Sequence, residues 1–262
     1  MDLGVRDRGF LVVGGTAGIG REVARLLVEE GARVAITGRD AGRATEVAAR
    51  IGAVAVPGDA ATDQSSCEAI VRAADHAVSG LSGIAVTAGN NRSAHSTLEA
   101  ATDEIWEETF QHQLMATVRI VRAALPRLVT NGGGSVVTTA AYSIRAPHIN
   151  RVPYVTCKSA VATFTKDVAK AYGPAGVRAN CVCPGIIETD HLAARRATLA
   201  ASRGVPEAGL LESMLGTEWH MDVAMGRLGL PEEVADLIAF LLSTRAGYLN
   251  GALINIDGGT DF

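Results

Sequence analysis

The chain has 262 residues, of which 48% are hydrophobic and 20% charged, and its formal net charge is −4. A chain of this length and composition can bury a sizeable core within one domain without disulfides or bound metal. Its slightly acidic charge and its lack of basic stretches exclude a typical nucleic-acid-binding surface, and no apolar run approaches the roughly 20 residues of a membrane-spanning helix.

The four cysteines and the charged N-terminus indicate a reducing compartment. Cys67, Cys157, Cys181 and Cys183 form no CxxC pair and no zinc-ligand spacing, so we expect free core thiols and no metal site. The first eight residues carry four charges where a secretory signal peptide needs an apolar stretch. We therefore expect a cytoplasmic protein that binds neither nucleic acid nor membrane.

Short apolar runs alternate with helical patterns along the whole chain. Most runs are continuous rather than alternating, as in strands that are covered on both faces of a parallel sheet. Helices are predicted between them, among them Ile19–Glu30 and Pro231–Ser243, and this alternation predicts right-handed crossovers in a single α/β domain over residues 1–262. Seven strands are predicted: Phe10–Val13, Arg33–Thr37, Val54–Val56, Ile84–Thr87, Ser135–Thr139, Arg178–Val182 and Ala252–Ile256.

A glycine-rich turn follows the first predicted strand. Gly14, Gly18 and Gly20 stand in a G-x-x-x-G-x-G spacing, which differs from the general dinucleotide fingerprint. Such a turn exposes backbone N–H groups at a helix N-terminus, where the helix dipole favours phosphate. A Cβ at these positions would hold the backbone away from a pyrophosphate. Its place after the first strand of a doubly wound pattern predicts a nucleotide site.

The second predicted strand is followed by Gly38 and Arg39, at the place where the adenosine ribose of a dinucleotide would lie. An acidic residue there would bond the ribose hydroxyls and repel a 2′-phosphate. Arg39 can instead hold a 2′-phosphate with charge-assisted, bidentate bonds. The alternative is a surface arginine in a turn, followed by Asp40. We expect NADP(H) to be favoured over NAD(H).

Tyr154 and Lys158 lie four residues apart in a helix predicted to continue to about Tyr172, so they share one helical face. An ammonium near a phenol favours the phenolate and is expected to lower the pKa of Tyr154. A tyrosine tuned in this way can exchange a proton with a carbinol oxygen while hydride moves to or from nicotinamide. A pair at this spacing is common by chance, but here it follows the fifth strand of a nucleotide-binding pattern.

Residues 186–226 contain no strand pattern and interrupt the alternation. Long excursions in compact domains are usually functional lids or binding loops. A substrate lid is therefore predicted, with a pair of surface helices as the alternative. At the carboxyl edge of the sheet, Arg92 and Arg145 are candidates for contacting an acidic substrate, although solvated loop residues would show the same pattern.

With these features in place, the sequence resembles the short-chain dehydrogenase/reductase family over essentially its whole length. The resemblance implies a Rossmann-like sheet of seven parallel strands with helices on both faces. It also implies a homotetramer or homodimer built on the helix of Tyr154 and Lys158. The matching motifs are Gly14-x-x-x-Gly18-Ile19-Gly20, Asp59, Ala88-Gly89, Tyr154-x-x-x-Lys158, Asn180 with Pro184-Gly185 and Thr189, Arg227-x-Gly229-x-Pro231-Glu232-Glu233, and Asp257-Gly258-Gly259.

The resemblance also implies particular cofactor contacts. The backbone from Thr16 through Ile19 would bind the phosphates, Asp59 would bond the adenine amine, and Lys158 would hold the nicotinamide ribose. Four residues after the sixth strand would line the nicotinamide. The full set of expected cofactor residues is Gly14, Thr16, Ala17, Gly18, Ile19, Gly20, Arg39, Asp59, Ala60, Ala88, Gly89, Tyr154, Lys158, Pro184, Gly185, Ile187 and Thr189.

Two departures from the family pattern affect the expected catalytic group. The family's serine, thirteen residues before the tyrosine, is replaced by Ala141, and its helical asparagine falls on Gln113. Ser143 or Tyr142 can supply the missing hydrogen bond if the loop is shifted. The substrate can also carry its own polar neighbour, or catalysis can be weak or absent.

The prediction is an oxidoreductase that transfers hydride between NADP(H) and a carbonyl or secondary-alcohol substrate. Tyr154 is the expected general acid or base, Lys158 its partner, and Ser143 the substitute donor. The alternative function is a non-catalytic NADP(H)-binding sensor or scaffold protein, which the missing serine favours and the retained tyrosine–lysine pair disfavours.

Overall fold

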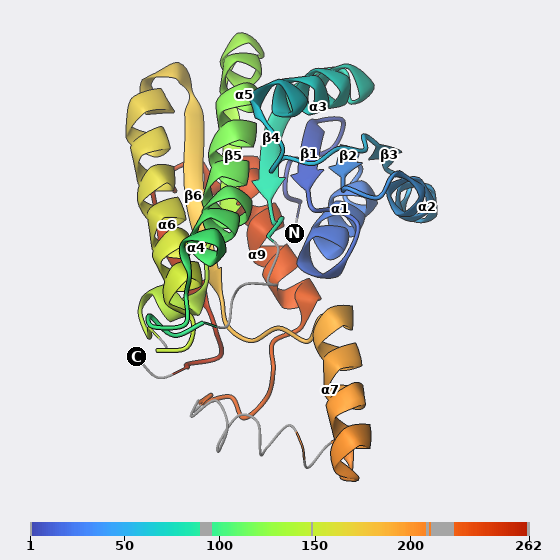
Figure 1. The fold of residues 1–262 in the computed structure, drawn as a ribbon. Helices are drawn as coiled ribbons and strands as arrows, with labels where there is room; N and C mark the ends of the chain where they lie inside the picture. Colours follow the sequence, from blue (N-terminus) through green and yellow to red (C-terminus); the bar gives the residue numbers. More distant parts are fainter. Residues whose placement is uncertain (1, 90–95, 148, 208–209, 211–222, 261–262) are drawn as a thin grey trace.

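The computed structural model describes residues 2–89, 96–147, 149–207, 210 and 223–260. Their strands form one parallel sheet of seven strands in the order β3-β2-β1-β4-β5-β6-β7 (Figure 1). This is the predicted doubly wound Rossmann-like sheet. The strands are β1 (Gly9–Val13), β2 (Arg33–Thr37), β3 (Val54–Ala55), β4 (Leu81–Val86), β5 (Gly134–Thr139), β6 (Val177–Pro184) and β7 (Leu253–Ile256).

Helices cover both faces of the sheet. One buried core lies between the sheet and α1 with α9, and a second lies between the sheet and α3, α5 and α6. The principal helices are α1 (Gly18–Glu29), α2 (Ala41–Ile51), α3 (Gln64–Ala77), α4 (Asp103–Thr109), α5 (Ala116–Thr130), α6 (Val152–Tyr172), α7 (Asp190–Arg203) and α9 (Pro231–Leu242).

All seven predicted strands are confirmed, although several of their ends differ. The fourth strand begins at Leu81 rather than Ile84, because Leu81 pairs with Gly9 of β1. Thr87, which was predicted within that strand, lies beyond its end and its hydroxyl donates to the Val13 carbonyl at 2.9 Å. β6 extends to Pro184 because its last residues pair with β7.

Local signals explain where the helices begin. α9 starts at Pro231, as predicted, and the Glu233 carboxylate accepts the Leu230 backbone N–H at 2.8 Å. The predicted lid segment begins with a helix, α7, whose N-cap Thr189 accepts the Leu192 backbone N–H at 3.4 Å. Residues 208–209 and 211–222 of the lid lie outside the described residues.

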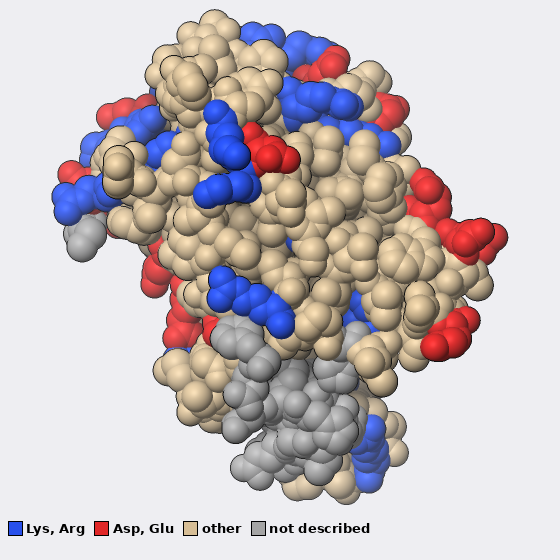
Figure 2. Space-filling model, turned by 90° about the vertical axis from the view of Figure 1, so that its left-hand side faces the viewer, with Lys and Arg blue, Asp and Glu red and all other residues tan. Residues whose placement is uncertain are grey.

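The cysteines are the free core thiols that the sequence predicts, because all four are buried and unpaired. No helix in the described part of the chain is long and apolar enough to span a membrane. Figure 2 faces the side of the molecule that carries α6, and most of the surface seen there is uncharged, with basic and acidic side chains both near its middle and along its edges.

Candidate active site

Two neighbouring cavities lie at the carboxyl ends of the parallel strands, where open α/β sheets bind ligands. They share Thr87 and Gly89 and measure about 350 and 320 Å³. These volumes fall within the range of small-molecule sites, on the order of 300–1,000 Å³. The two cavities therefore offer one continuous binding region along this edge.

The predicted site residues divide between these two cavities. The first, called the catalytic cavity below, is lined by Ile19, Gly89, Ser143, Tyr154, Lys158, Pro184, Gly185, Ile187 and Thr189. The second, called the adenosine cavity below, is lined by Gly14, Thr16, Ala17, Arg39, Asp59, Ala60, Ala88 and Gly89. Gly18 and Gly20 line neither cavity and lie in the first turn of α1.

The glycine turn has the geometry that a bound phosphate needs. Gly14 has φ +85°, and a Cβ there would lie 2.8 Å from the Ala88 backbone nitrogen. A Cβ at Gly20 would collide with the Gly14 carbonyl and the Thr87 hydroxyl. Ala17, the N-cap of α1, provides no side-chain hydrogen bond. The first N–H groups of α1 are therefore left for an anion, so this turn fits a dinucleotide phosphate.

One residue that lines the adenosine cavity is an arginine, at the place where the adenosine ribose of a dinucleotide is expected. Arg39 is exposed and lines this cavity. Asp40 is engaged elsewhere, because its carboxylate caps α2 by accepting the Arg43 backbone N–H at 3.0 Å. The Arg43 Nε in turn donates to the Thr16 carbonyl at 3.3 Å. Arg43 does not itself line the adenosine cavity.

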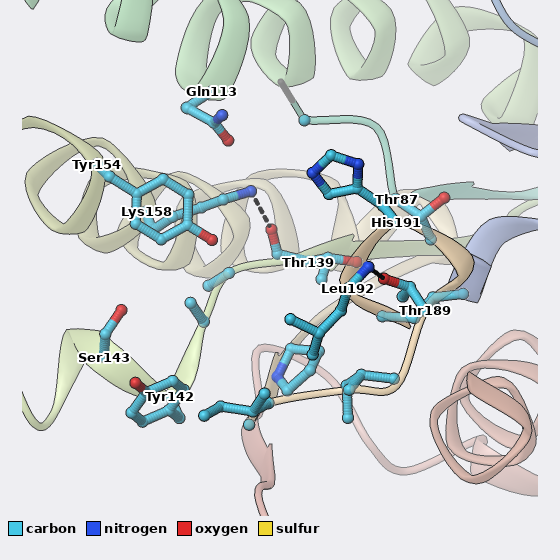
Figure 3. Close-up of a pocket in the computed structure, with 18 of the residues that line it drawn as sticks. Thr87, Gln113, Thr139, Tyr142, Ser143, Tyr154, Lys158, Thr189, His191 and Leu192 are labelled. Carbon is cyan, nitrogen blue, oxygen red and sulfur yellow. Dashed lines mark hydrogen bonds between the residues drawn. The ribbon is translucent and has the colours of Figure 1, made fainter. Parts of the chain in front are cut away.

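The catalytic cavity brings Tyr154 and Lys158 together near the start of α6, as predicted. Figure 3 shows both side chains directed from α6 toward the cavity, with Ser143 and Tyr142 on a separate wall segment. The Lys158 Nζ donates to the Thr139 carbonyl at 3.0 Å and lies 5.9 Å from the centre of the Tyr154 ring. This bond fixes the amine at the end of β5.

The expected lowering of the Tyr154 pKa by Lys158 is not found in the cofactor-free protein. Loss of solvent around the phenol raises the pKa of Tyr154 to about 12, opposed mainly by the positive charge of Arg151. Burial also lowers the pKa of Lys158 to about 8. Desolvation dominates both groups, so at neutral pH Tyr154 holds its proton as an acid would.

Replacing Lys158 with methionine is expected to stabilise the cofactor-free protein by about 2 kcal/mol at pH 7. The pKa of the lysine falls from 10.5 to about 8 on folding, so burying its ammonium costs about 3 kcal/mol. The variant also loses the hydrogen bond to Thr139, which lowers its net stabilisation by about 1 kcal/mol. Unfolding in urea at constant pH measures the difference.

The pH dependence distinguishes this cause from ordinary packing. Between pH 8 and 10.5 the unfolded chain binds more protons at Lys158 than the folded chain does, so the stability of the unmodified protein should rise with pH. The difference in unfolding free energy between Lys158→Met and the unmodified protein should therefore be smaller at about pH 9.5 than at pH 7. Equal stabilisation at both pH values would contradict the desolvation argument.

Ser143 occupies the wall of the catalytic cavity with an unsatisfied hydroxyl. It lies in a short 3-10 helix, Tyr142–Ile144, that follows β5. Its side chain is 1% exposed, and its Oγ has no hydrogen-bond partner among the described residues. Ala141, at the family's serine position, lines the same cavity and offers no donor. A buried hydroxyl without a partner is costly to keep, so Ser143 is suited to meet a bound substrate.

Gln113 reaches the catalytic cavity from an irregular segment of helix. Phe110–Met115 forms a π-helix between α4 and α5, a form that is frequent at functional sites. Gln113 is buried, and its Oε1 would lie 2.9 Å from a Cβ at Gly89. The wider turn thus places the glutamine amide at the junction of the two cavities, at the position where the family pattern puts its helical asparagine, although the π-helix itself was not predicted.

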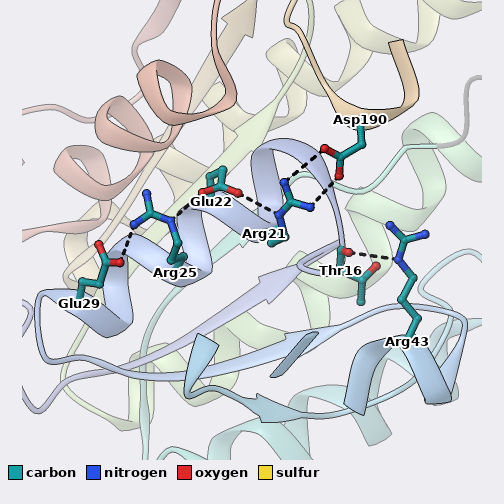
Figure 4. A network of polar contacts seen from close by, with 7 residues as sticks. All are labelled: Thr16, Arg21, Glu22, Arg25, Glu29, Arg43 and Asp190. Carbon is teal, nitrogen blue, oxygen red and sulfur yellow. Dashed lines mark hydrogen bonds and ion pairs between the residues drawn. The ribbon is translucent and has the colours of Figure 1, made fainter. Parts of the chain in front are cut away.

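The first residues of the predicted lid contact α1, the helix that follows the glycine turn. Arg21 of α1 binds Asp190, the first residue of α7, with its Nη1 2.6 Å from the carboxylate (Figure 4). A Cβ at Gly18 would lie 3.1 Å from the Thr189 Cγ2. The start of α7 therefore lies directly beside the glycine turn.

Three cavity-lining basic residues were not assigned to the site from the sequence. Arg151 lines the catalytic cavity just before α6, and His191 and Arg195 line it from α7. The two arginines proposed for an acidic substrate fare differently: Arg145 is exposed and does not line this cavity, and Arg92 lies outside the described residues. No group of three or more potential metal ligands occurs in the described part of the chain.

Comparison with known proteins identifies similar chains along nearly the full length. A family model described as Enoyl-(Acyl carrier protein) reductase matches residues 14–261. The uncharacterized oxidoreductase YhxD of Bacillus subtilis is 32% identical over 259 residues, covering 96% of this chain and 82% of that protein. The 3-oxoacyl-(acyl-carrier-protein) reductase FabG of Aquifex aeolicus is 29% identical over 99% of both chains.

A solved structure shares both the fold and its proportions. L-sorbose reductase from Gluconobacter frateurii, complexed with NADPH and L-sorbose, matches with a TM-score of 0.91 at 28% identity. The match covers 99% of this chain and 98% of that chain.

Proposed function

The chain belongs to the short-chain dehydrogenase/reductase family and is a dehydrogenase/reductase acting on CH–OH/C=O groups, and on that premise we propose that Tyr154 exchanges the proton of this reaction and that NADP(H) is its cofactor. The observation that carries the proposal is the convergence of Tyr154, Lys158 and the unsatisfied Ser143 hydroxyl on one cavity.

Each side chain has a distinct task in carbonyl reduction. When bound, NADPH would supply the hydride that the carbonyl carbon accepts. Tyr154 gives its phenolic proton to the carbonyl oxygen, which suits a phenol whose pKa is raised to about 12. Ser143 donates a hydrogen bond to the same oxygen. Lys158, whose amine donates to the Thr139 carbonyl, would hold the nicotinamide ribose. In alcohol oxidation the same groups act in reverse.

Turnover of NADPH with a panel of ketones and aldehydes tests this proposal. Consumption of NADPH that depends on the carbonyl compound and yields the matching alcohol is the expected result. If NADPH binds but no carbonyl compound in a broad panel is reduced, the alternative of a non-catalytic NADP(H)-binding protein replaces the proposal. The paired tyrosine and lysine in a substrate-sized cavity argue against that alternative.

Arg39→Asp is expected to weaken NADPH binding by about 10- to 100-fold and to remove the preference over NADH. Arg39 lines the adenosine cavity while Asp40 is held at the start of α2. The NADPH bound by the sorbose reductase structure supports the same preference. Fluorescence titration with both cofactors measures the change.

A matched control is Arg72→Asp, which makes the same charge reversal at an exposed position of α3 that lines neither cavity. It should leave both affinities unchanged. Retention of the NADPH preference in Arg39→Asp would assign the 2′-phosphate to another group, with Arg43 the next candidate.

The assembly, the lid and the cellular location belong to the proposal as well. A homotetramer or homodimer through α6 is supported by the largely uncharged face that carries this helix (Figure 2). A substrate lid at residues 186–226 is supported by the four α7 and pre-α7 residues Thr189, His191, Leu192 and Arg195, which line the catalytic cavity. The cytoplasmic location is the expectation from the sequence.

A further inference from the structure

The ionisable side chains that the structure describes around the catalytic cavity are predominantly basic. Among the described residues of its wall, four side chains are basic, namely Arg151, Lys158, His191 and Arg195, and none is Asp or Glu. Lys158 is committed to the Thr139 carbonyl. Two guanidinium groups therefore remain at the wall as permanent positive charges.

The acidic side chains nearest in the chain to α7 are already paired with other arginines. The Asp190 carboxylate binds Arg21 at 2.6 Å, and the Glu188 carboxylate binds Arg196 at 2.6 Å. Arg195 makes no hydrogen bond or ion pair with another described residue. The adjacent arginines of α7 thus differ: Arg196 is neutralised by its neighbours, and Arg195 lines the cavity with no acidic partner among the residues that the structure describes.

Arg151 lines the same cavity from the start of α6, whereas Arg195 lines it from α7. It is the N-cap of α6, one turn before Tyr154, and its side chain is partly buried. Its guanidinium forms no hydrogen bond with any other described residue, and its charge is the strongest one acting on the Tyr154 phenol. A half-buried guanidinium without a partner favours binding of an oxyanion, which it can hold with two parallel hydrogen bonds.

We propose that the substrate carries a terminal oxyanion, such as a carboxylate, in addition to its carbonyl or alcohol group, and that Arg151 and Arg195 bind this oxyanion. The inference rests on the proposed function, because the reacting carbonyl is placed at Tyr154 in the same cavity. Arg39 and the first residues of the glycine turn, Gly14 to Ala17, line or adjoin the adenosine cavity instead, and the NADP+ titrations below separate an oxyanion of the substrate from the cofactor's phosphates.

Binding of keto acids to the protein saturated with NADP+ tests the inference without turnover. The probes are methyl-ketone carboxylates with one to four methylene groups between the carbonyl and the carboxylate, each compared with its methyl ester by calorimetry. At the best spacing the carboxylate should bind about 10- to 100-fold more tightly than its ester. The difference should shrink as salt concentration rises.

Variants assign the preference to the two arginines. Arg151→Ala and Arg195→Ala should each remove most of the carboxylate preference, while Arg195→Lys should retain part of it because charge remains without the guanidinium fork. Arg196→Gln is the matched control, since it removes a charge from the same helix that is held by Glu188. It should leave the preference intact, and NADP+ affinity should be unchanged in Arg195→Ala.

The outcomes separate this inference from the proposed function. Equal binding of acids and esters, or stronger binding of neutral L-sorbose than of any keto acid, would overturn the anion site. Weaker NADP+ binding in Arg195→Ala with an unchanged carboxylate preference would do the same for that arginine. A carboxylate preference that persists while no carbonyl compound is ever reduced would instead contradict the proposed function.

Discussion

Tyr154→Phe is expected to lower kcat for carbonyl reduction by about 10²–10⁴-fold while leaving NADPH affinity nearly unchanged. The substitution removes one hydroxyl from a ring that lines the catalytic cavity. That hydroxyl keeps its proton at neutral pH because desolvation raises the pKa of Tyr154 to about 12. Single-turnover reduction with pre-bound NADPH isolates the chemical step.

The reverse reaction gives this prediction a second readout. Alcohol oxidation needs the phenolate, so its rate should rise with pH across the neutral and alkaline range in the unmodified enzyme. Tyr172→Phe is the matched control, because Tyr172 ends the same helix and does not line the cavity. If the Tyr154→Phe variant reduced carbonyl compounds at the full rate, another group would be the acid.

Ser143→Ala is expected to lower kcat by about 10²–10³-fold, the usual effect of removing one donor to a developing oxyanion. The Ser143 Oγ is buried in the cavity wall without a partner among the described residues. Removing such a hydroxyl should leave stability unchanged or slightly higher. The predicted loss of rate is therefore separable from unfolding, and stopped-flow turnover together with thermal unfolding measures both.

Two further variants identify the donor. Tyr142→Phe should have little effect, since Tyr142 is the competing candidate on the same wall. Restoring the family's donor with Ala141→Ser in the Ser143→Ala background should recover part of the rate, because Ala141 also lines the cavity. Full activity in Ser143→Ala combined with a large loss in Tyr142→Phe would reassign the hydrogen bond to the tyrosine.

Much of the fold was predictable because its signals are local. The glycine turn, the continuous apolar strands and the proline-initiated α9 each depend on neighbours in the chain. The pairing of Tyr154 with Lys158 follows from helical spacing alone. Strand ends were less predictable, since the start of β4 at Leu81 depends on pairing with β1, far away in the sequence.

The parts of the site that the sequence did not reveal depend on tertiary surroundings. The direction of the Tyr154 pKa shift is determined by desolvation, which spacing cannot measure. The π-helix that presents Gln113 has no sequence signature in this chain. Arg195 and Arg196 are adjacent and chemically identical, and only the structure shows that Arg196 meets Glu188 whereas Arg195 faces the cavity.

The ion pair between Arg21 and Asp190 has a consequence for redesign of this enzyme. Because it joins the cofactor helix to the first residue of α7, a substitution at either position disturbs two binding surfaces at once. Arg195 lies more than one turn further along α7 and makes no such bond to another described residue. Substitutions in α7 beyond this ion pair are therefore the best way to change the substrate preference, because they alter the cavity wall and leave the contacts to the cofactor in place.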